Sequence, residues 1–175
     1  MTVSRCQELR MSHRHQAVLV AATVVSRLLS FLLLQVSSRL SLFDSSPLLV
    51  TTSKWAQPLL RWDSFHFLHI AEHGYVYENE WAFLPGTSFV MRISAKLLCF
   101  PFNSKLNPLV AGALAAMACD TTRTLYHLTF HLLGSPSLAY LTALLSLVPS
   151  NPATLYVVPY SEPFFTYLSY KGKGA

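Results

Sequence analysis

Long apolar stretches and shorter polar ones alternate along the chain. After a polar start over residues 1–16, residues 17–36 read AVLVAATVVSRLLSFLLLQV, with a single charge at Arg27. A bilayer core needs about 20 mostly apolar residues in a helix, so this stretch is long enough to cross one. A cleaved signal peptide is the alternative, but its apolar region usually has only about 7–15 residues. We therefore predict a retained transmembrane helix over residues 17–36.

Further apolar segments follow a polar loop at residues 37–81, but they are shorter and are broken by Pro, Gly and single charges. A membrane tolerates such breaks where helices bury them or where they line a cavity. We therefore predict an all-α membrane protein, a multi-spanning helical bundle with four or five membrane-associated helices. We expect the later helices within residues 82–170, and we interpret residues 171–175 as a truncated end.

Composition and charge support a membrane location and set the orientation. Hydrophobic residues make up 52% of the chain and charged residues 12%, about half the charged share of soluble domains. The net charge of +5 comes from scattered bases, so we expect no nucleic-acid partner. Three Arg against one acid in residues 1–16, and more acids than bases in residues 37–81, predict a cytosolic N-terminus. The loop at residues 37–81 then faces the lumen or the exterior.

The segment RWDSFHFLHIAEHGY, residues 61–75, carries most of the chemistry of that loop. We predict a short helix over Ser64–His73, with Asp63 as its N-cap and Gly74 ending it. As N-cap, the Asp63 carboxylate would accept a hydrogen bond from the backbone N–H of Phe65 or His66. Capping does not exclude catalysis, because a cap fixes the direction of the carboxylate.

Three histidines, His66, His69 and His73, share one face of this predicted helix. His69 to His73 also fit the H-x-x-E-H pattern of zinc peptidases, with Glu72 as general base. Such a site needs a third protein ligand, and no candidate stands out in the sequence. We favour histidines that pack the loop helix and expect no metal, while the zinc peptidase stays an alternative. The nearby Trp and Tyr residues fit either a membrane-interface belt or a carbohydrate-stacking surface.

A carboxylate also lies within a late apolar aromatic run. Glu162, in the sequence YSEPFF, is a functional-site candidate because carboxylates inside membranes are costly. Pro163 follows it, and we expect a local backbone distortion there.

Two segments together resemble the PIG-V-like family of GPI mannosyltransferases. They are RWDSFHFLHIAEHGYVYENEWAFLPG at residues 61–86 and NPATLYVVPYSEPFFTYLSYKG at residues 151–172, and their order and spacing agree with that family. The resemblance implies a multi-pass endoplasmic-reticulum enzyme of GT-C type. It further implies transfer of the second, α1,6-linked mannose to the GPI-anchor precursor glycolipid on the luminal face. The resemblance implies dolichyl-phosphate mannose as the donor. It also implies contact with the lipids of the endoplasmic-reticulum membrane, and a small membrane co-subunit is a further expected partner.

The same resemblance assigns roles to single residues. Asp63 matches the first-loop aspartate of GT-C enzymes and is the expected catalytic base. A cation near the departing phosphate is expected at Arg61, Arg92 or Arg123, in that order. The lipid-phosphate donor leaves no diphosphate for a metal to bridge, so no cofactor is expected. Two non-enzymatic alternatives remain: a truncated membrane protein without activity, and a membrane subunit or transporter fragment. We expect substrate-binding residues at Arg61, Trp62, Glu72, His73, Tyr75 and Glu162.

Overall fold

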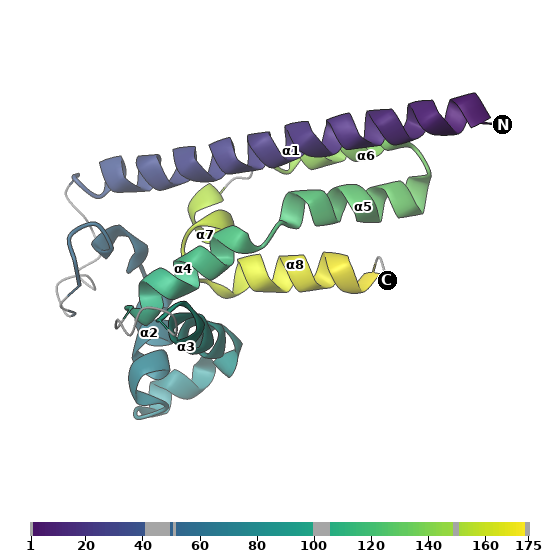
Figure 1. Ribbon diagram of the computed structural model, residues 1–175. Coiled ribbons are helices and arrows are strands. Elements are labelled where there is room, and N and C mark those ends of the chain that lie inside the picture. The colour runs from purple at the N-terminus through teal and green to yellow at the C-terminus, as the bar shows by residue number, and fades with distance from the viewer. Residues whose placement is uncertain (1, 41–49, 51, 100–105, 149–150, 174–175) are drawn as a thin grey trace.

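The computed structural model describes residues 2–40, 50, 52–99, 106–148 and 151–173. Within these ranges the chain is all-α, as predicted, and contains no strand. Figure 1 shows α1 running the length of the molecule, with α5 and α6 beside it, α8 beside α5, and α2 and α3 at one end. The elements are α1 (Thr2–Ser37), η2 (Gln57–Leu59), α2 (Asp63–His73), η3 (Glu78–Ala82), α3 (Pro85–Cys99), α4 (Pro108–Ala118), α5 (Thr121–Leu133), α6 (Pro136–Leu145), α7 (Pro152–Tyr156) and α8 (Ser161–Lys173).

The first helix contains the predicted membrane span and extends beyond it on the N-terminal side. Residues Arg14–Ser37 are long and apolar enough to cross a bilayer. Its inward face is partly polar, because Thr23, Arg27 and Ser30 are buried at helical spacing. The valines and leucines between them, such as Val25 and Leu29, are exposed. Polar groups inside and apolar groups outside are the arrangement expected of a helix surrounded by lipid.

The later apolar segments form helices near the predicted positions, but they are short. None of the described helices after α1 exceeds the 15 residues of α3, and a bilayer core needs about 20. A multi-spanning bundle therefore stays a prediction. The run at residues 153–170 is not one helix, because the segment 157–160 separates α7 from α8. Pro163 lies in the first turn of α8, where a missing N–H costs no hydrogen bond. The prediction of a backbone distortion there was wrong, because α8 runs without a break from Ser161 to Lys173.

Arg27 joins α1 to the break between α4 and α5. Its guanidinium donates to the carbonyl oxygens of Met117 and Cys119, which lie where α4 ends and α5 has not begun. Carbonyls at a helix end lack partners within the helix, and the arginine supplies donors for these two. The guanidinium carbon also lies 5.7 Å from the centre of the Tyr156 ring. One buried cation therefore connects three separate parts of the chain.

Helices α3 and α4 approach closely at Gly112. A Cβ built at this glycine would lie 2.5 Å from Met91 Cγ and 2.9 Å from the Pro159 Cβ. Small residues permit such close approach between helices, and α4 is rich in alanine for the same reason. The crossing brings α3, α4 and the segment after α7 together.

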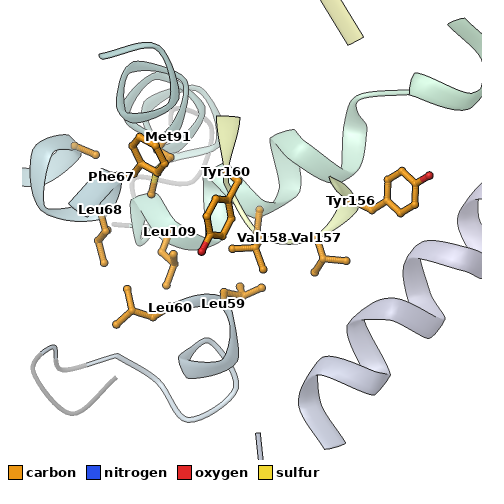
Figure 2. Packing of buried hydrophobic residues seen from close by; sticks show 12 residues of the cluster. Leu59, Leu60, Phe67, Leu68, Met91, Leu109, Tyr156, Val157, Val158 and Tyr160 are labelled. Atoms are coloured by element: carbon orange, nitrogen blue, oxygen red, sulfur yellow. The ribbon is translucent and has the colours of Figure 1, made fainter. Parts of the chain in front are cut away.

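The main core joins the two sequence segments that carry the family resemblance. Leu59, Leu60, Phe67 and Leu68 come from η2 and α2, and they pack with residues 156–160. Met91 from α3 and Leu109 from α4 complete the cluster, as Figure 2 shows. Residues nearly one hundred positions apart thus share one apolar interior that supports the start of α2.

Candidate active site

The chain enters α2 through a tight turn at Arg61 and Trp62. Trp62 is the N-cap residue, with φ 41° and ψ −118°, and makes no side-chain cap hydrogen bond. Ser64 closes the turn: its buried Oγ accepts from the Arg61 N–H at 3.0 Å and lies 2.6 Å from the Arg61 carbonyl oxygen. The Ser64 N–H also donates to that carbonyl, at 3.0 Å.

Asp63 is therefore not the N-cap, and the capping prediction was wrong. The helix begins at Asp63 itself, one residue earlier than expected. Backbone groups and the Ser64 hydroxyl close the turn, so the carboxylate is not needed for it. Asp63 is exposed to solvent. A carboxylate in the first helical turn is stabilised by the helix dipole, and here it stays accessible to an incoming substrate.

A hydrogen bond from the second motif holds this turn. The Tyr160 hydroxyl donates to the Arg61 carbonyl oxygen at 2.9 Å, and the Tyr160 ring packs edge-on against Phe67, with 6.5 Å between ring centroids. Two residues later, Glu162 lies exposed in the first turn of α8. The structure thus connects the turn that carries Arg61, Trp62 and Asp63 to the segment that leads into Glu162.

The other predicted substrate-binding residues lie at the far end of α2. Glu72 and His73 are exposed on its last turn, and ten residues of helix separate His73 from Asp63, about 15 Å along the axis. Tyr75 follows the helix, where its hydroxyl donates to the Phe83 carbonyl at 2.6 Å. Glu72 lines a separate groove with Lys96, Cys99 and Asn107. The predicted substrate-binding residues therefore form two groups. Arg61, Trp62 and Glu162 belong to the group connected to the Asp63 turn, and Glu72, His73 and Tyr75 lie at the far end of α2.

The histidines pack the loop helix. His66 stacks on Phe83 with ring centroids 4.5 Å apart, and His69 stacks on His73 at 4.8 Å. His69 Nδ1 is also hydrogen-bonded to the carboxylate of Glu80. Among the described residues, no group of three or more His, Cys, Asp or Glu is placed to hold a metal ion. This part of the chain does not supply the third ligand that the zinc-peptidase alternative requires.

Glu80 organises the loop after α2 from a buried position. Its side chain is 2% exposed, and its Oε2 accepts from the N–H groups of Val76 at 2.8 Å and Tyr77 at 2.9 Å. Burial raises the pKa of this carboxyl group, but the two N–H groups and His69 outweigh that effect. The pKa of Glu80 therefore lies below its ordinary value.

Sequence reasoning missed Ser64, Glu80 and Tyr160 as residues that shape this region. Ser64 follows the predicted base directly, and a serine next to a helix start is a recognised signal of a structural hydroxyl. Glu80 did carry a local signal, because it is the third residue of η3 and its carboxylate accepts from the N–H of the N-cap residue Tyr77 in a capping box. Its contact with His69, eleven residues earlier, depends on the fold. Tyr160 lies inside the second motif, but its partner is 99 residues away.

Comparison with known proteins gives one consistent result. A family model described as "Mannosyltransferase (PIG-V)" matches residues 13–175. GPI mannosyltransferase 2 of Cryptococcus neoformans is 36% identical over 158 residues, which cover 86% of this chain and 36% of the relative. GPI alpha-1,6-mannosyltransferase 2 of Cricetulus griseus is 34% identical over 128 residues, 66% of this chain and 24% of the relative. No solved structure matches the chain significantly.

The matched region contains both motif segments and nearly all of the described helices. The chain spans only about a third of the length of the Cryptococcus relative and about a quarter of the Cricetulus one. The family match nevertheless covers most of the chain, including the candidate membrane span and the Asp63 turn. This chain belongs to the PIG-V mannosyltransferase family.

Proposed function

We propose that the protein transfers the second, α1,6-linked mannose from dolichyl-phosphate mannose to the GPI-anchor precursor, at the luminal face of the endoplasmic-reticulum membrane. Family membership supports mannosyl transfer, and the printed name of the Cricetulus relative supports the α1,6 linkage. The observation that carries the site is the exposed Asp63, positioned by a turn that the second motif holds through Tyr160.

The chemistry is one displacement at the anomeric carbon of the donor mannose. The acceptor hydroxyl oxygen forms the new glycosidic bond while the bond from that carbon to the phosphate oxygen breaks. Dolichyl phosphate leaves with the bonding electron pair, and the acceptor proton passes to the Asp63 carboxylate. A positioned base of this kind contributes about 10²–10⁴-fold to the rate. A single displacement inverts the configuration, as a β-linked donor and an α-linked product require.

The departing phosphate needs a positive charge more than it needs a proton. Arg61 is our first candidate, because it is half-buried in the same turn as Asp63 and a guanidinium matches phosphate geometry well. Arg92 lies on α3 and Arg123 on α5. We propose no metal cofactor, since a lipid monophosphate donor has no diphosphate for a metal to bridge. A small membrane co-subunit is compatible with this proposal.

Asp63→Asn in the whole protein tests the assignment. Asp63 makes no cap hydrogen bond, so the variant is expected to reach normal protein levels and melt normally. Mannose transfer to the GPI precursor, assayed in microsomes lacking their own second mannosyltransferase, should fall by about 10²-fold or more. Glu78→Gln is the matched control, because Glu78 is another exposed carboxylate of the same loop. Near-normal transfer by Asp63→Asn would place the base elsewhere, with Glu162 as the next residue to replace.

A further inference from the structure

A pocket lies between α5 and α8, apart from the Asp63 turn. Its volume is about 300 Å³, at the lower end of the range for small-ligand sites. Its lining shares no residue with the proposed active site. The polar and aromatic groups that face it are Asp120, Arg123, His127, Tyr167, Tyr170 and Lys171.

Cations outnumber anions around this pocket. Asp120 is occupied by the fold: its Oδ1 accepts from the Arg123 N–H at 3.1 Å as the N-cap of α5, and its Oδ2 lies 3.5 Å from Arg123 Nη1. The Arg123 Nε is buried without a hydrogen-bond partner among the described residues. Lys171 Nζ lies 3.3 Å from the Tyr167 hydroxyl, and among the described residues Asp120 is the one carboxylate in the lining. A net positive charge and free N–H donors favour an anion here.

The position of the pocket favours an anion carried by a lipid. The pocket lies between the first turns of α5 and the last turns of α8. Both helices run toward the end of the molecule where the chain termini lie, as Figure 1 shows, while α2 and α3 lie at the other end. Isolated charges between apolar membrane-associated helices are costly and usually mark a functional site. On the proposed orientation, this end of the molecule faces the cytosolic leaflet.

We propose that the α5–α8 pocket binds the phosphate group of a membrane lipid. The guanidinium of Arg123 and the ammonium of Lys171 donate to the phosphate oxygens, with the Tyr170 and Tyr167 hydroxyls beside them. The Asp120 carboxylate faces the same pocket and stays paired with Arg123. The site is separate from the transfer reaction, so it stands or falls independently of the role proposed for Asp63.

Binding of a short-chain phosphatidic acid to the purified chain in a neutral detergent, followed by native mass spectrometry, tests this site. Dihexanoyl phosphatidic acid should bind, whereas dihexanoylglycerol, which lacks the phosphate, should not. Lys171→Gln and Arg123→Gln should each weaken the binding at least about tenfold, as expected for loss of a charge-assisted hydrogen bond. Inorganic phosphate as competitor shows whether the phosphate alone suffices or the lipid tails are also required.

Matched controls separate the pocket from general charge effects. Lys173→Gln removes an exposed cation two residues further along α8, outside the pocket, and should change the affinity less than twofold. Asp63→Asn should also leave it unchanged. Lys171 is exposed, so its replacement is compatible with folding even if Arg123→Gln weakens the cap of α5. Equal binding by the wild type and Lys171→Gln, or equal binding of both lipids, would overturn the proposal.

Discussion

Trp62 is the residue at which the backbone bends into α2. It is the one non-glycine residue in the described chain with a positive φ, at 41°, and such a conformation costs about 1–3 kcal/mol. Hydrogen bonds from Ser64 and Tyr160 to the Arg61 carbonyl hold it in place. A strained turn held from both sides fixes where Asp63 lies, which is what a catalytic base requires.

Glu80 gives the loop a predictable response to acid. Its pKa lies below the ordinary value of 4.5, so its contribution to stability is present above that pH and is lost as the pH falls through the lowered folded value. Wild type should therefore melt higher than Glu80→Gln at neutral pH, and the difference should shrink below about pH 4. Thermal unfolding in detergent at several pH values measures this difference.

Glu78→Gln is the control for the acid experiment, since Glu78 is exposed two residues away. The difference in melting temperature between Glu78→Gln and the wild type should stay small at every pH. A Glu80→Gln difference that is equally large at neutral and acid pH would show that the lost packing, rather than the charge, is responsible.

At the scale of single residues, the catalytic role of Asp63 stays a prediction, while its predicted role as N-cap can be compared with the structure. The motif indicated Asp63 as a candidate residue, but the prediction that it caps α2 was wrong. Capping depends on the φ of Trp62 and on where the Ser64 hydroxyl points. Neither quantity can be derived from residue types. The separation of Glu72 and His73 from Asp63, by contrast, follows from helix geometry alone, because ten residues of helix span about 15 Å.

Among the elements, the crossing of α3 and α4 is the most sensitive to a small change in volume. Gly112→Ala would place a Cβ within 2.9 Å of the Pro159 ring, which cannot move aside as the Met91 side chain can. Overpacking of this kind should lower the free energy of unfolding by about 1–3 kcal/mol. Denaturant unfolding of the chain in detergent would measure the loss.

Gly86→Ala is the matched control on α3, because nothing lies within 4 Å of a Cβ at that position. Alanine is the better helix former, so stability should stay equal or rise by up to about 1 kcal/mol. Equal effects of the two substitutions would show that the close approach at Gly112 does not limit packing.

Helix positions were easier to predict than helix ends. Helices α4, α5 and α6 lie within residues 82–170, where later helices were predicted, and Pro108, Asp120 and Pro136 lie at their starts. The division between α7 and α8 was missed, because residues 153–170 were interpreted as one mostly apolar, aromatic run although Pro159 interrupts it. Pro159 is a local signal for the end of α7, because a proline disfavours helix at the residue before it. Tertiary packing adds to it, since Val157, Val158 and Tyr160 enter the core next to α2, and such long-range contacts leave no local pattern.

For the whole molecule, the arrangement of charged ends predicts an orientation. The N-terminus of α1 and the C-terminus of α8 lie at one end (Figure 1), and Lys171 and Lys173 add positive charge there. Basic residues favour the cytosolic side. Trp81→Thr creates a glycosylation acceptor at Asn79, which is exposed, and this site should be modified in microsomes.

Thr2→Asn creates a second acceptor, Asn-Val-Ser, at the opposite end of α1. It should remain unmodified, because glycosylation occurs in the lumen. A gel shift that disappears on deglycosylation measures both sites. Modification at residue 2 and not at Asn79 would reverse the orientation and remove the luminal location proposed for Asp63.

The buried cation of α1 has a consequence for biosynthesis. The carbonyls that accept from Arg27 belong to residues made about ninety positions later, which at usual translation speeds is roughly 5–20 seconds. A lone arginine near the middle of a membrane helix costs about 2.5–3.5 kcal/mol on insertion scales. During that interval the newly made helix is expected to stay beside the protein-conducting channel or a chaperone. We expect its release into lipid to wait until the nascent chain delivers α4.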